Sequence, residues 1–253
     1  MIRISIITVV LNDLEGLKRT HRSVFEQSNK SFEWIVRDGG SDGRTIDFLL
    51  SLGEAVKWIS EPDRGIYDAM NRGVSMSAGE YVVFMNAGDT FCDSTSLSKV
   101  DGYLSANNQI ADVLFGGAML SFSGGGRMVY RPPRLVEKSL WHGLPANHQA
   151  TYYRRSLLSQ TPYNLQYSLC GDYYLAATLM RNGACAAYLD EPLAIFEVGG
   201  QSYKRLAQLF AEPYRIQRDV LCSPWYYRLA SVFKRFVSTL GFVVLSQPFF
   251  RNK

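Results

Sequence analysis

The sequence is poor in the residues that bind zinc or cross-link a small fold. It has four cysteines, none of them in a CxxC pair, and only three histidines. A zinc site with the usual Cys/His spacing is therefore excluded. The cysteines are expected to be buried, reduced thiols, which favours a reducing compartment. They are Cys92, Cys170, Cys185 and Cys222.

A strong charge of one sign is also missing, and so is a secretory leader. The formal net charge is only +4 over 253 residues, which does not resemble a dedicated nucleic-acid binder. The amino-terminal MIRISIITVV lacks the longer apolar core and the small-residue cleavage site of a signal peptide. We therefore expect a cytoplasmic protein with no nucleic-acid partner.

Two phosphate-binding motifs are absent as well. No GxxxxGK[ST] loop occurs in the chain, and no GxGxxG follows the first apolar run. These absences disfavour a nucleotide hydrolase and an ordinary dinucleotide dehydrogenase. With 47% hydrophobic residues, the chain is still able to bury the core of one large domain or two small ones.

Apolar runs that alternate with helical spacing predict the fold class. The strands expected in the first half cover residues 2–11, 32–36, 56–59 and 81–85, and the helices between them cover 14–27, 45–52 and 66–76. This alternation predicts an α/β fold with a doubly wound, mainly parallel sheet and flanking helices. In the second half, strands are expected at 112–120, 127–130, 149–153 and 193–197, and a helix at 169–181.

Polar residues follow three of the predicted strands. Asn12 follows the first strand, Asp38 the second, and the loop 86–89 the fourth. In doubly wound sheets, ligands bind beyond the carboxyl ends of the strands. The three strand ends are therefore expected to offer polar groups to one crevice.

Asp38 and Asp89 each have two interpretations. Asp38 precedes two glycines, so a ligand is able to approach its carboxylate, but a turn residue that caps the next helix would look the same. Asp89 follows an apolar strand with Asn86 and Gly88 beside it, and one such carboxylate suits Mg²⁺ or Mn²⁺ when phosphates supply the other oxygens. Its alternative is an Asx turn that leads into a helix after Ser94.

Asp172 and His148 are the candidates for proton transfer. Asp172 lies at the start of the predicted helix 169–181, where the helix dipole stabilises an acid, so simple capping is one interpretation. The other is a general base that removes a proton from an acceptor hydroxyl. His148 is a second candidate, although a lone histidine is more often a structural hydrogen-bond partner.

Taken together, these segments resemble the family 2 glycosyltransferases, which have the GT-A fold. The resemblance covers residues 2–203 and its strength lies in the order of the segments. They are ISIITVVLN at 4–12, WIVRDGGSDG at 34–43, EPDRGIYDAMNRG at 61–73, AGEY at 78–81, FMNAGD at 84–89, NHQ at 147–149, GDY at 171–173 and FEVGGQS at 196–202. The last three follow in the order seen in a branch that builds exopolysaccharide and O-antigen units, including colanic-acid-type enzymes.

The resemblance implies a role for each matched residue. Asp172 would be the catalytic base, and Asp89 would hold Mg²⁺ or Mn²⁺ on the donor diphosphate. Asp38 would contact the base of the donor nucleotide. The other residues with an implied place in the donor site are Asn12, Asn71, Asn86 and Gly88.

The reaction that this resemblance implies is an inverting transfer of a single sugar from a nucleotide sugar to a glycan acceptor, which a lipid would carry. The donor would be a UDP-sugar first and a GDP-sugar second. The QxxRW motif of processive synthases is absent, which favours one sugar per encounter. Three positions depart from the common pattern: Gly88 replaces the first carboxylate of the metal motif, Met70 an arginine, and Leu11 an aromatic residue.

The chain is expected to divide into a glycosyltransferase domain and a tail. The domain covers 1–220, with a nucleotide-binding half at 1–110 and an acceptor half at 111–220, and the tail at 221–253 is basic, aromatic and amphipathic. Charged and polar residues interrupt the apolar run that a bilayer span needs. This favours peripheral contact of 225–250 with the inner face of the cytoplasmic membrane. The alternative is a helix packed on the domain.

The sequence leaves two alternatives to a glycosyltransferase. A sugar nucleotidyltransferase usually carries a basic, glycine-rich loop after the first strand, and residues 8–16 contain none. A catalytically inactive nucleotide-sugar-binding protein is the alternative from another class. Gly88 gives that alternative some support, while the presence of Asp89 and Asp172 argues against it.

Overall fold

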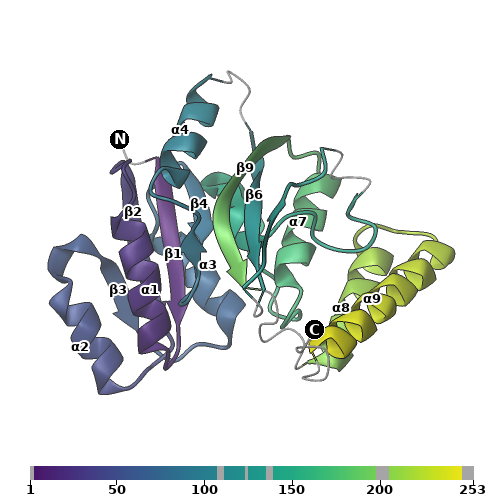
Figure 1. Cartoon of the computed structure of the whole chain (residues 1–253), viewed down its shortest axis with the longest axis horizontal. Helices are drawn as coiled ribbons and strands as arrows, with labels where there is room; N and C mark the ends of the chain where they lie inside the picture. Colours follow the sequence, from purple (N-terminus) through teal and green to yellow (C-terminus); the bar gives the residue numbers. More distant parts are fainter. Residues whose placement is uncertain (1–2, 107–110, 123–124, 135–138, 198–204, 247–253) are drawn as a thin grey trace.

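The computed structural model describes residues 3–106, 111–122, 125–134, 139–197 and 205–246, and side chains up to residue 239. A single sheet of nine strands connects both halves of the chain (Figure 1). Its order is β3-β2-β1-β4-β8-β6-β9-β5, with β7 paired to β6. The strands are β1 (Ile4–Val10), β2 (Phe32–Asp38), β3 (Lys57–Ser60), β4 (Tyr81–Phe84), β5 (Thr90–Phe91), β6 (Val113–Ser121), β7 (Arg127–Tyr130), β8 (Thr151–Arg154) and β9 (Ala186–Glu197).

Helices cover both faces of this sheet, as predicted for a doubly wound fold. The described helices are α1 (Leu14–Phe25), α2 (Gly43–Ser51), α3 (Ile66–Met76), α4 (Ser96–Ala106), α6 (Arg155–Gln160), α7 (Gly171–Arg181), α8 (Leu206–Asp219) and α9 (Trp225–Ser246), with 3₁₀ turns η1 (Gly53–Ala55) and η2 (His148–Ala150). One apolar cluster joins the sheet to α1, α2 and α4. A second cluster joins the sheet to α3, α6, α7 and α8.

The first half follows the predicted βαβ pattern. β1 lies between β2 and β4 and pairs with both in parallel, and β2 pairs in parallel with β3. Such strands are covered on both faces, which is why they appear in the sequence as continuous apolar runs. The loops after β1, β2 and β4 consequently meet at one edge, where Gly39 N–H donates to Val10 O and Ala87 N–H donates to Val9 O, at 2.9 and 3.0 Å.

The second half is a mixed sheet, so the expectation of a mainly parallel sheet holds for the first half only. β8 is antiparallel to both β4 and β6, whereas β6 and β9 are parallel. β9 starts at Ala186, well before the predicted strand at 193–197. Its first part was not predicted, because Pro192 and two acidic residues interrupt the apolar pattern of the strand. The short strand β5 and the helices α6 and α8 were not predicted.

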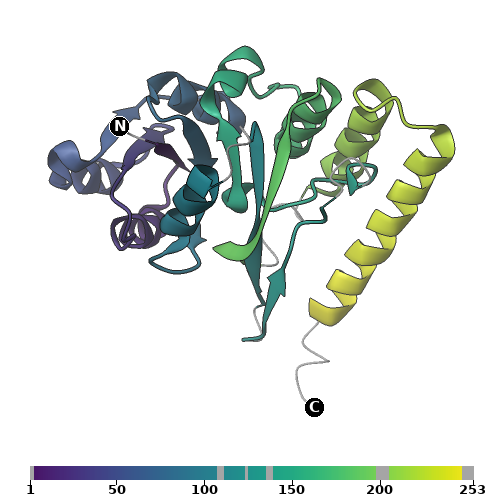
Figure 2. The same ribbon diagram turned by 90° about the horizontal axis from the view of Figure 1, so that it is seen from above.

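α9 forms the outer edge of the molecule (Figures 1 and 2). It packs on α8, and its buried Ser231 accepts a hydrogen bond from Gln217 at 2.7 Å. The apolar side chains of α9 point away from this contact: Trp225, Leu229, Phe233 and Phe236 are all more than half exposed. Within the described part of the chain, no helix has the length and apolarity needed to cross a membrane.

The cysteines are free thiols, as expected, but they are not all buried. Cys170 is buried and Cys92 is half-buried, whereas Cys185 and Cys222 are exposed. Cys185 immediately precedes β9, and Cys222 lies in the connection between α8 and α9 with a φ of +49°. The expectation of burial is therefore wrong for these two residues.

Candidate active site

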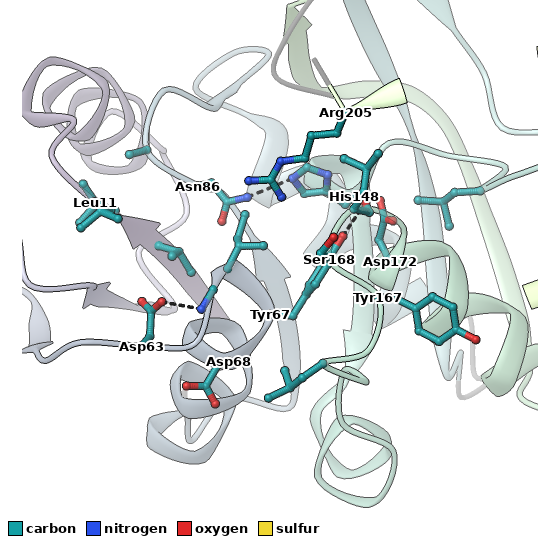
Figure 3. Close-up of a pocket in the computed structure, with 18 of the residues that line it drawn as sticks. Leu11, Asp63, Tyr67, Asp68, Asn86, His148, Tyr167, Ser168, Asp172 and Arg205 are labelled. Carbon is teal, nitrogen blue, oxygen red and sulfur yellow. Dashed lines mark hydrogen bonds between the residues drawn. The ribbon is translucent and has the colours of Figure 1, made fainter. Parts of the chain in front are cut away.

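A first cavity of about 1020 Å³ lies at the carboxyl ends of β1 and β4 (Figure 3). The parallel half of the sheet contributes Leu11 and Asn86 to its wall, and the second half contributes His148 and Asp172. This is the edge at which a doubly wound sheet binds its ligands. The structure therefore brings the predicted donor loop and the predicted base to one space.

Asp89 is held by hydrogen bonds to both of its oxygens. Its Oδ2 accepts the backbone N–H of Asn86 at 2.9 Å, and its Oδ1 accepts Nε2–H of Gln149 at 3.0 Å. The residue that leads into α4 is Asp93, which accepts the N–H of Thr95 at 2.8 Å. An Asx turn into that helix is therefore the wrong interpretation of Asp89.

His148 is close to Asp89 and is influenced by the charge of both candidate carboxylates. Its Nε2 is 3.6 Å from Asp89 Oδ2 and 3.3 Å from Asn86 Nδ2. Burial lowers the pKa of His148, but the hydrogen bond and charge of Asp89, together with the charge of Asp172, raise it by more. A protonated Nε2–H faces Asp89 Oδ2, and the buried Oδ1 of Asn86 has no hydrogen-bond partner in the described structure.

Asp172 is placed at the first turn of α7 with a carboxylate suited to accept a proton. Burial raises the pKa of Asp172, and the nearby charge of His148 offsets part of this rise. Its Oδ1 accepts the N–H of its neighbour Tyr173 at 2.8 Å. A carboxylate whose pKa is moved toward neutrality is a stronger base, so the environment suits general-base catalysis.

The turn before α7 is held by a second carboxylate, while Asp172 itself accepts a first-turn N–H, as the capping interpretation expects. Glu212 of α8 accepts four hydrogen bonds, from the N–H and hydroxyl of Ser168 at 2.8 and 3.0 Å and from the N–H groups of Leu169 and Cys170 at 3.0 and 2.7 Å. Glu212 is 4% exposed. This buried carboxylate fixes the turn from which Asp172 projects.

Tyr67 of α3 supports the same turn from the other side. Its hydroxyl donates to the carbonyl of Leu169 at 2.8 Å, and its ring stacks on Tyr163 with centroids 4.9 Å apart. A Cβ at position 171 would lie 2.7 Å from the ring of Tyr67, so this close approach requires Gly171. Burial, with the nearby charge of Asp172, raises the pKa of Tyr67 well above its usual range, so the phenol stays protonated and donates.

Asp38 lies at the expected strand end, but it does not cap the next helix. Its Oδ2 accepts from the N–H groups of Gly40 and Ser41 at 3.1 and 2.8 Å and from the hydroxyl of Ser60 at 2.6 Å. The cap of α2 is Asp42. Asp38 is 1% exposed and lines neither of the two cavities, and its buried Oδ1 has no partner in the described structure.

Asn12 and Asn71 are both engaged with the protein itself, and neither lines the first cavity. Asn12, with a φ of +53°, accepts the N–H of Asp42 at 3.1 Å and so joins the loops after β1 and β2. The amide of Asn71 makes two hydrogen bonds with the backbone of Tyr163, at 2.9 and 2.8 Å. These contacts suit a role in shaping the site rather than direct contact with a donor.

A second cavity of about 730 Å³ adjoins the first on the other side of the loop 86–89. The two cavities share Asn86 and His148, while Gly88 and Asp89 line the second one. Three arginines from separate elements also line it, namely Arg19, Arg127 and Arg235.

The donor chemistry around Asp89 fits a hard divalent cation, although sparsely. The described residues contain no group of three or more His, Cys, Asp or Glu side chains placed to hold a metal. Asp89 offers a carboxylate with 20% exposure, and Asn86 Oδ1 is a further oxygen in the same loop. Mg²⁺ and Mn²⁺ are commonly held by one or two carboxylates plus substrate phosphates, so these residues are sufficient.

Arg205 is a site residue that the sequence did not reveal. It precedes α8, is exposed, and extends its guanidinium over the first cavity toward Asn86 and His148 (Figure 3). It lies two residues beyond the segment that carries the family resemblance. The only sequence signal was its closeness to the last matched motif at 196–202.

The chain belongs to glycosyl transferase family 2, whose model matches residues 5–162. It is 31% identical over 208 residues to a PGL/p-HBAD biosynthesis glycosyltransferase of Mycobacterium bovis (strain BCG / Pasteur 1173P2), covering 78% of each chain. It is 32% identical over 182 residues to an uncharacterized glycosyltransferase of Mycobacterium tuberculosis (strain ATCC 25618 / H37Rv), covering 70% of this chain and 69% of the other. The protein is therefore a glycosyltransferase.

Solved structures confirm the GT-A fold. The chain is similar to S. aureus TarS 1-349, with a TM-score of 0.67 and 16% identity over 97% of this chain and 76% of that one. It is also similar to the mannosyltransferase PcManGT of Pyrobaculum calidifontis in complex with GDP-Man and Mn²⁺, with a TM-score of 0.65, 16% identity and the same two coverages. At these identities the likeness concerns the fold alone.

Proposed function

We propose that this glycosyltransferase moves one sugar from a nucleotide sugar to a glycan acceptor with inversion at the anomeric carbon. One observation carries the proposal: His148 lines both cavities, is 3.6 Å from Asp89 in the second, and shares the wall of the first with Asp172. Asp89 is suited to a metal ion on the donor diphosphate, and Asp172 is suited to accept a proton from the acceptor.

The donor would lie in the first cavity, against the ends of β1 and β4. A UDP-sugar is the first choice and a GDP-sugar the second, because TarS has been solved with UDP and UDP-GlcNAc, and PcManGT with GDP-Man. The unpartnered Oδ1 of Asp38 is an acceptor for a base N–H. Leu11 lines the cavity and would lie against the base.

The charges of the first cavity favour a metal-bound diphosphate. Four carboxylates and two arginines line it, namely Asp13, Asp63, Asp68, Asp172, Arg64 and Arg205. Arg64 is already paired with Asp68 at 2.9 Å. A diphosphate therefore needs more positive charge than the wall supplies. Mg²⁺ or Mn²⁺, held by Asp89 with Asn86 and Gly88 in the same loop, would neutralise charge on the leaving diphosphate.

Asp172 would act on the acceptor. Its carboxylate accepts the proton of the acceptor hydroxyl while that oxygen bonds to the anomeric carbon. The bond from the same carbon to the diphosphate oxygen breaks, and the nucleoside diphosphate leaves with the bonding electrons. Attack from the face opposite the leaving group inverts the anomeric configuration, and Arg205 over the cavity is placed to attract the departing charge.

The function is tested by nucleotide release from a panel of UDP-, GDP- and dTDP-sugars with Mg²⁺ or Mn²⁺. Asp89→Asn and Asp172→Asn should each lower the rate by about 100-fold or more. Asp47→Asn, on the exposed surface of α2, is the matched control and should leave the rate unchanged. Equal rates in wild type and Asp172→Asn would rule out Asp172 as the base.

The alternative function is that of a catalytically inactive nucleotide-sugar-binding protein, which the missing carboxylate at Gly88 supports. Such a protein would bind one donor in the panel and release no nucleotide, even with membrane lipid extract as acceptor. Release from one donor, lost on chelation of the metal, excludes this alternative.

The acceptor is proposed to be lipid-linked, in exopolysaccharide or O-antigen assembly, with the protein on the inner face of the cytoplasmic membrane. The order of the matched segments supports the pathway, although the curated relatives carry other names. The structure supports peripheral membrane contact, because the exposed stripe of α9 is apolar and aromatic and the described helix contains no acidic residue. The inward side of α9 packs on α8, which agrees with the alternative interpretation of the tail as a packed helix. The proposed membrane contact therefore concerns the outer stripe of the same helix.

Vesicle binding tests the membrane contact. The full chain should sediment with vesicles that contain about one third phosphatidylglycerol, and Phe233→Ser combined with Phe236→Ser should abolish sedimentation. Leu50→Ser removes an equally exposed leucine from α2 and serves as the control. Unchanged sedimentation of the double variant would refute attachment through this stripe.

A further inference from the structure

The second cavity has a charge pattern opposite to that of the first. Its wall carries the three arginines Arg19, Arg127 and Arg235 against two carboxylates, Asp89 and Glu197. The first cavity carries twice as many carboxylates as arginines. When Asp89 holds the proposed metal ion, Glu197 is the one remaining carboxylate of this wall opposite three arginines, so a further anionic group is matched to the second cavity.

The three arginines reach this cavity from elements that are far apart in the chain. Arg19 lies on α1, and its Nη2 is 3.4 Å from the position that a Cβ on Gly88 would take. Arg127 is the first residue of β7 and is exposed. Within the described residues, neither of these two guanidinium groups has an ion pair with a carboxylate. Arg235 of α9 lines the cavity and also donates to the carbonyl of His142.

α9 connects the second cavity to the proposed membrane surface. Its inner residues Arg235, Ser238 and Thr239 line the cavity, whereas its outer stripe, including Phe233 and Phe236, is exposed and apolar. If the outer stripe rests on the bilayer, the cavity opens beside the lipid headgroups. A phosphate that joins a glycan to its lipid anchor lies at that depth.

We propose that the second cavity is the acceptor entrance and that Arg19, Arg127 and Arg235 bind the phosphate or diphosphate of a lipid-linked acceptor. The acceptor glycan then extends past Asn86 and His148, which both cavities share, toward the anomeric carbon in the first cavity. Guanidinium groups suit this task because their forked donors match phosphate oxygens. The inference rests on the proposed function, in which the first cavity holds the donor.

The test is binding of n-decyl phosphate to the full chain by isothermal titration calorimetry, with the first cavity saturated by UDP and Mn²⁺. Arg127→Gln and Arg19→Gln should each weaken binding about tenfold, the effect of losing one charge-assisted contact. Arg131→Gln is the matched control: this exposed arginine follows β7 and lines neither cavity, so its affinity should equal that of wild type. Thermal unfolding of each variant confirms the fold.

Three results would overturn the inference. Equal binding of decanol and decyl phosphate would show that the chain recognises the alkyl tail only. Loss of decyl phosphate binding on addition of UDP and Mn²⁺ would place the anion in the donor site. Unchanged affinity in both arginine variants would exclude the arginine cluster. The donor reaction is judged separately by nucleotide release, so a protein that releases nucleotide but fails here retains its proposed function and loses only this subsite.

Discussion

Glu212 offers the sharpest test of how the structure places Asp172, the proposed catalytic base. It belongs to α8, outside the matched family segment, yet its carboxylate accepts all four hydrogen bonds offered by residues 168–170. These residues form the turn immediately before Asp172. The substitution Glu212→Gln keeps the size of the side chain and changes one acceptor oxygen into an NH₂ donor.

The expected loss follows from these contacts. With one oxygen retained toward Ser168, the new NH₂ group faces the N–H groups of Leu169 and Cys170, which then have no acceptor. Hydrogen bonds to charged groups contribute about 1.5–3 kcal/mol each and are not additive, while removal of a buried charge recovers some desolvation. We expect unfolding to be easier by about 3 kcal/mol. For a chain of this size that lowers Tm by on the order of 8 °C.

The assay combines thermal unfolding with the steady-state kinetics of nucleotide release. If Glu212 positions Asp172, Glu212→Gln should lower kcat by about tenfold at a temperature where the variant is folded. KM for the donor should change by less than about twofold, because the proposed donor contacts lie at the ends of β1 and β4. The matched control is Glu54→Gln, an exposed glutamate in η1, which should change neither quantity.

Two outcomes would refute this reasoning. A Tm equal to that of wild type would mean that the four contacts do not hold the turn. A lower Tm with unchanged kcat would mean that Glu212 supports the fold but that Asp172 is placed without it. A parallel rise in KM for the donor would show that the perturbation spreads through the whole site.

The remaining predictions concern charge at the centre of the site. His148→Gln removes the positive charge that lowers the pKa of Asp172, so the pKa of Asp172 should rise further. In a profile of kcat against pH, measured between about pH 5 and pH 8, the acid limb should then move to higher pH. An acid limb that stays in place or moves lower contradicts this coupling. Gly88→Asp should lower the free energy of unfolding, measured in urea, by about 1–2 kcal/mol. The φ of +98° is strained for any L residue, and pairing of the new carboxylate with Arg19 offsets only part of this strain. A stability equal to wild type would show that the loop adapts. EDTA should abolish nucleotide release, and Mn²⁺ should restore it in wild type but not in Asp89→Asn; full activity in EDTA refutes the metal.

The donor half was predictable because its signals are local. The parallel strands β1, β2 and β4 are covered on both faces, so apolar runs mark them, and glycine and asparagine mark the loops that follow. Asp38 and Asp89 could be located at strand ends from these signals alone. Their partners could not, because the hydrogen bond from Gln149 to Asp89 spans 60 residues of sequence.

The acceptor half was predictable only in part because its geometry depends on distant contacts. Asp172 could be named from its place in the helix and from the family resemblance. Its surroundings depend on Glu212, 40 positions later, and on Tyr67, which approaches Gly171 from α3. α8 interrupts its own helical pattern with Pro213, and β9 contains Pro192, so neither element has a regular period.

Gly88 stands where the family pattern has a carboxylate, and the backbone conformation and the nearby charge explain this difference. A φ of +98° is a conformation that suits glycine, and it lets Asp89 turn back to accept the N–H of Asn86. The space where a carboxylate would begin is instead approached by Arg19, 3.4 Å away. One anionic group is thus absent and a cationic group is present at the same point. With one carboxylate and a nearby guanidinium, this loop has little affinity for a divalent cation alone, whereas the nucleoside diphosphate in the first cavity supplies the missing oxygen ligands. The metal is therefore expected to arrive with the donor.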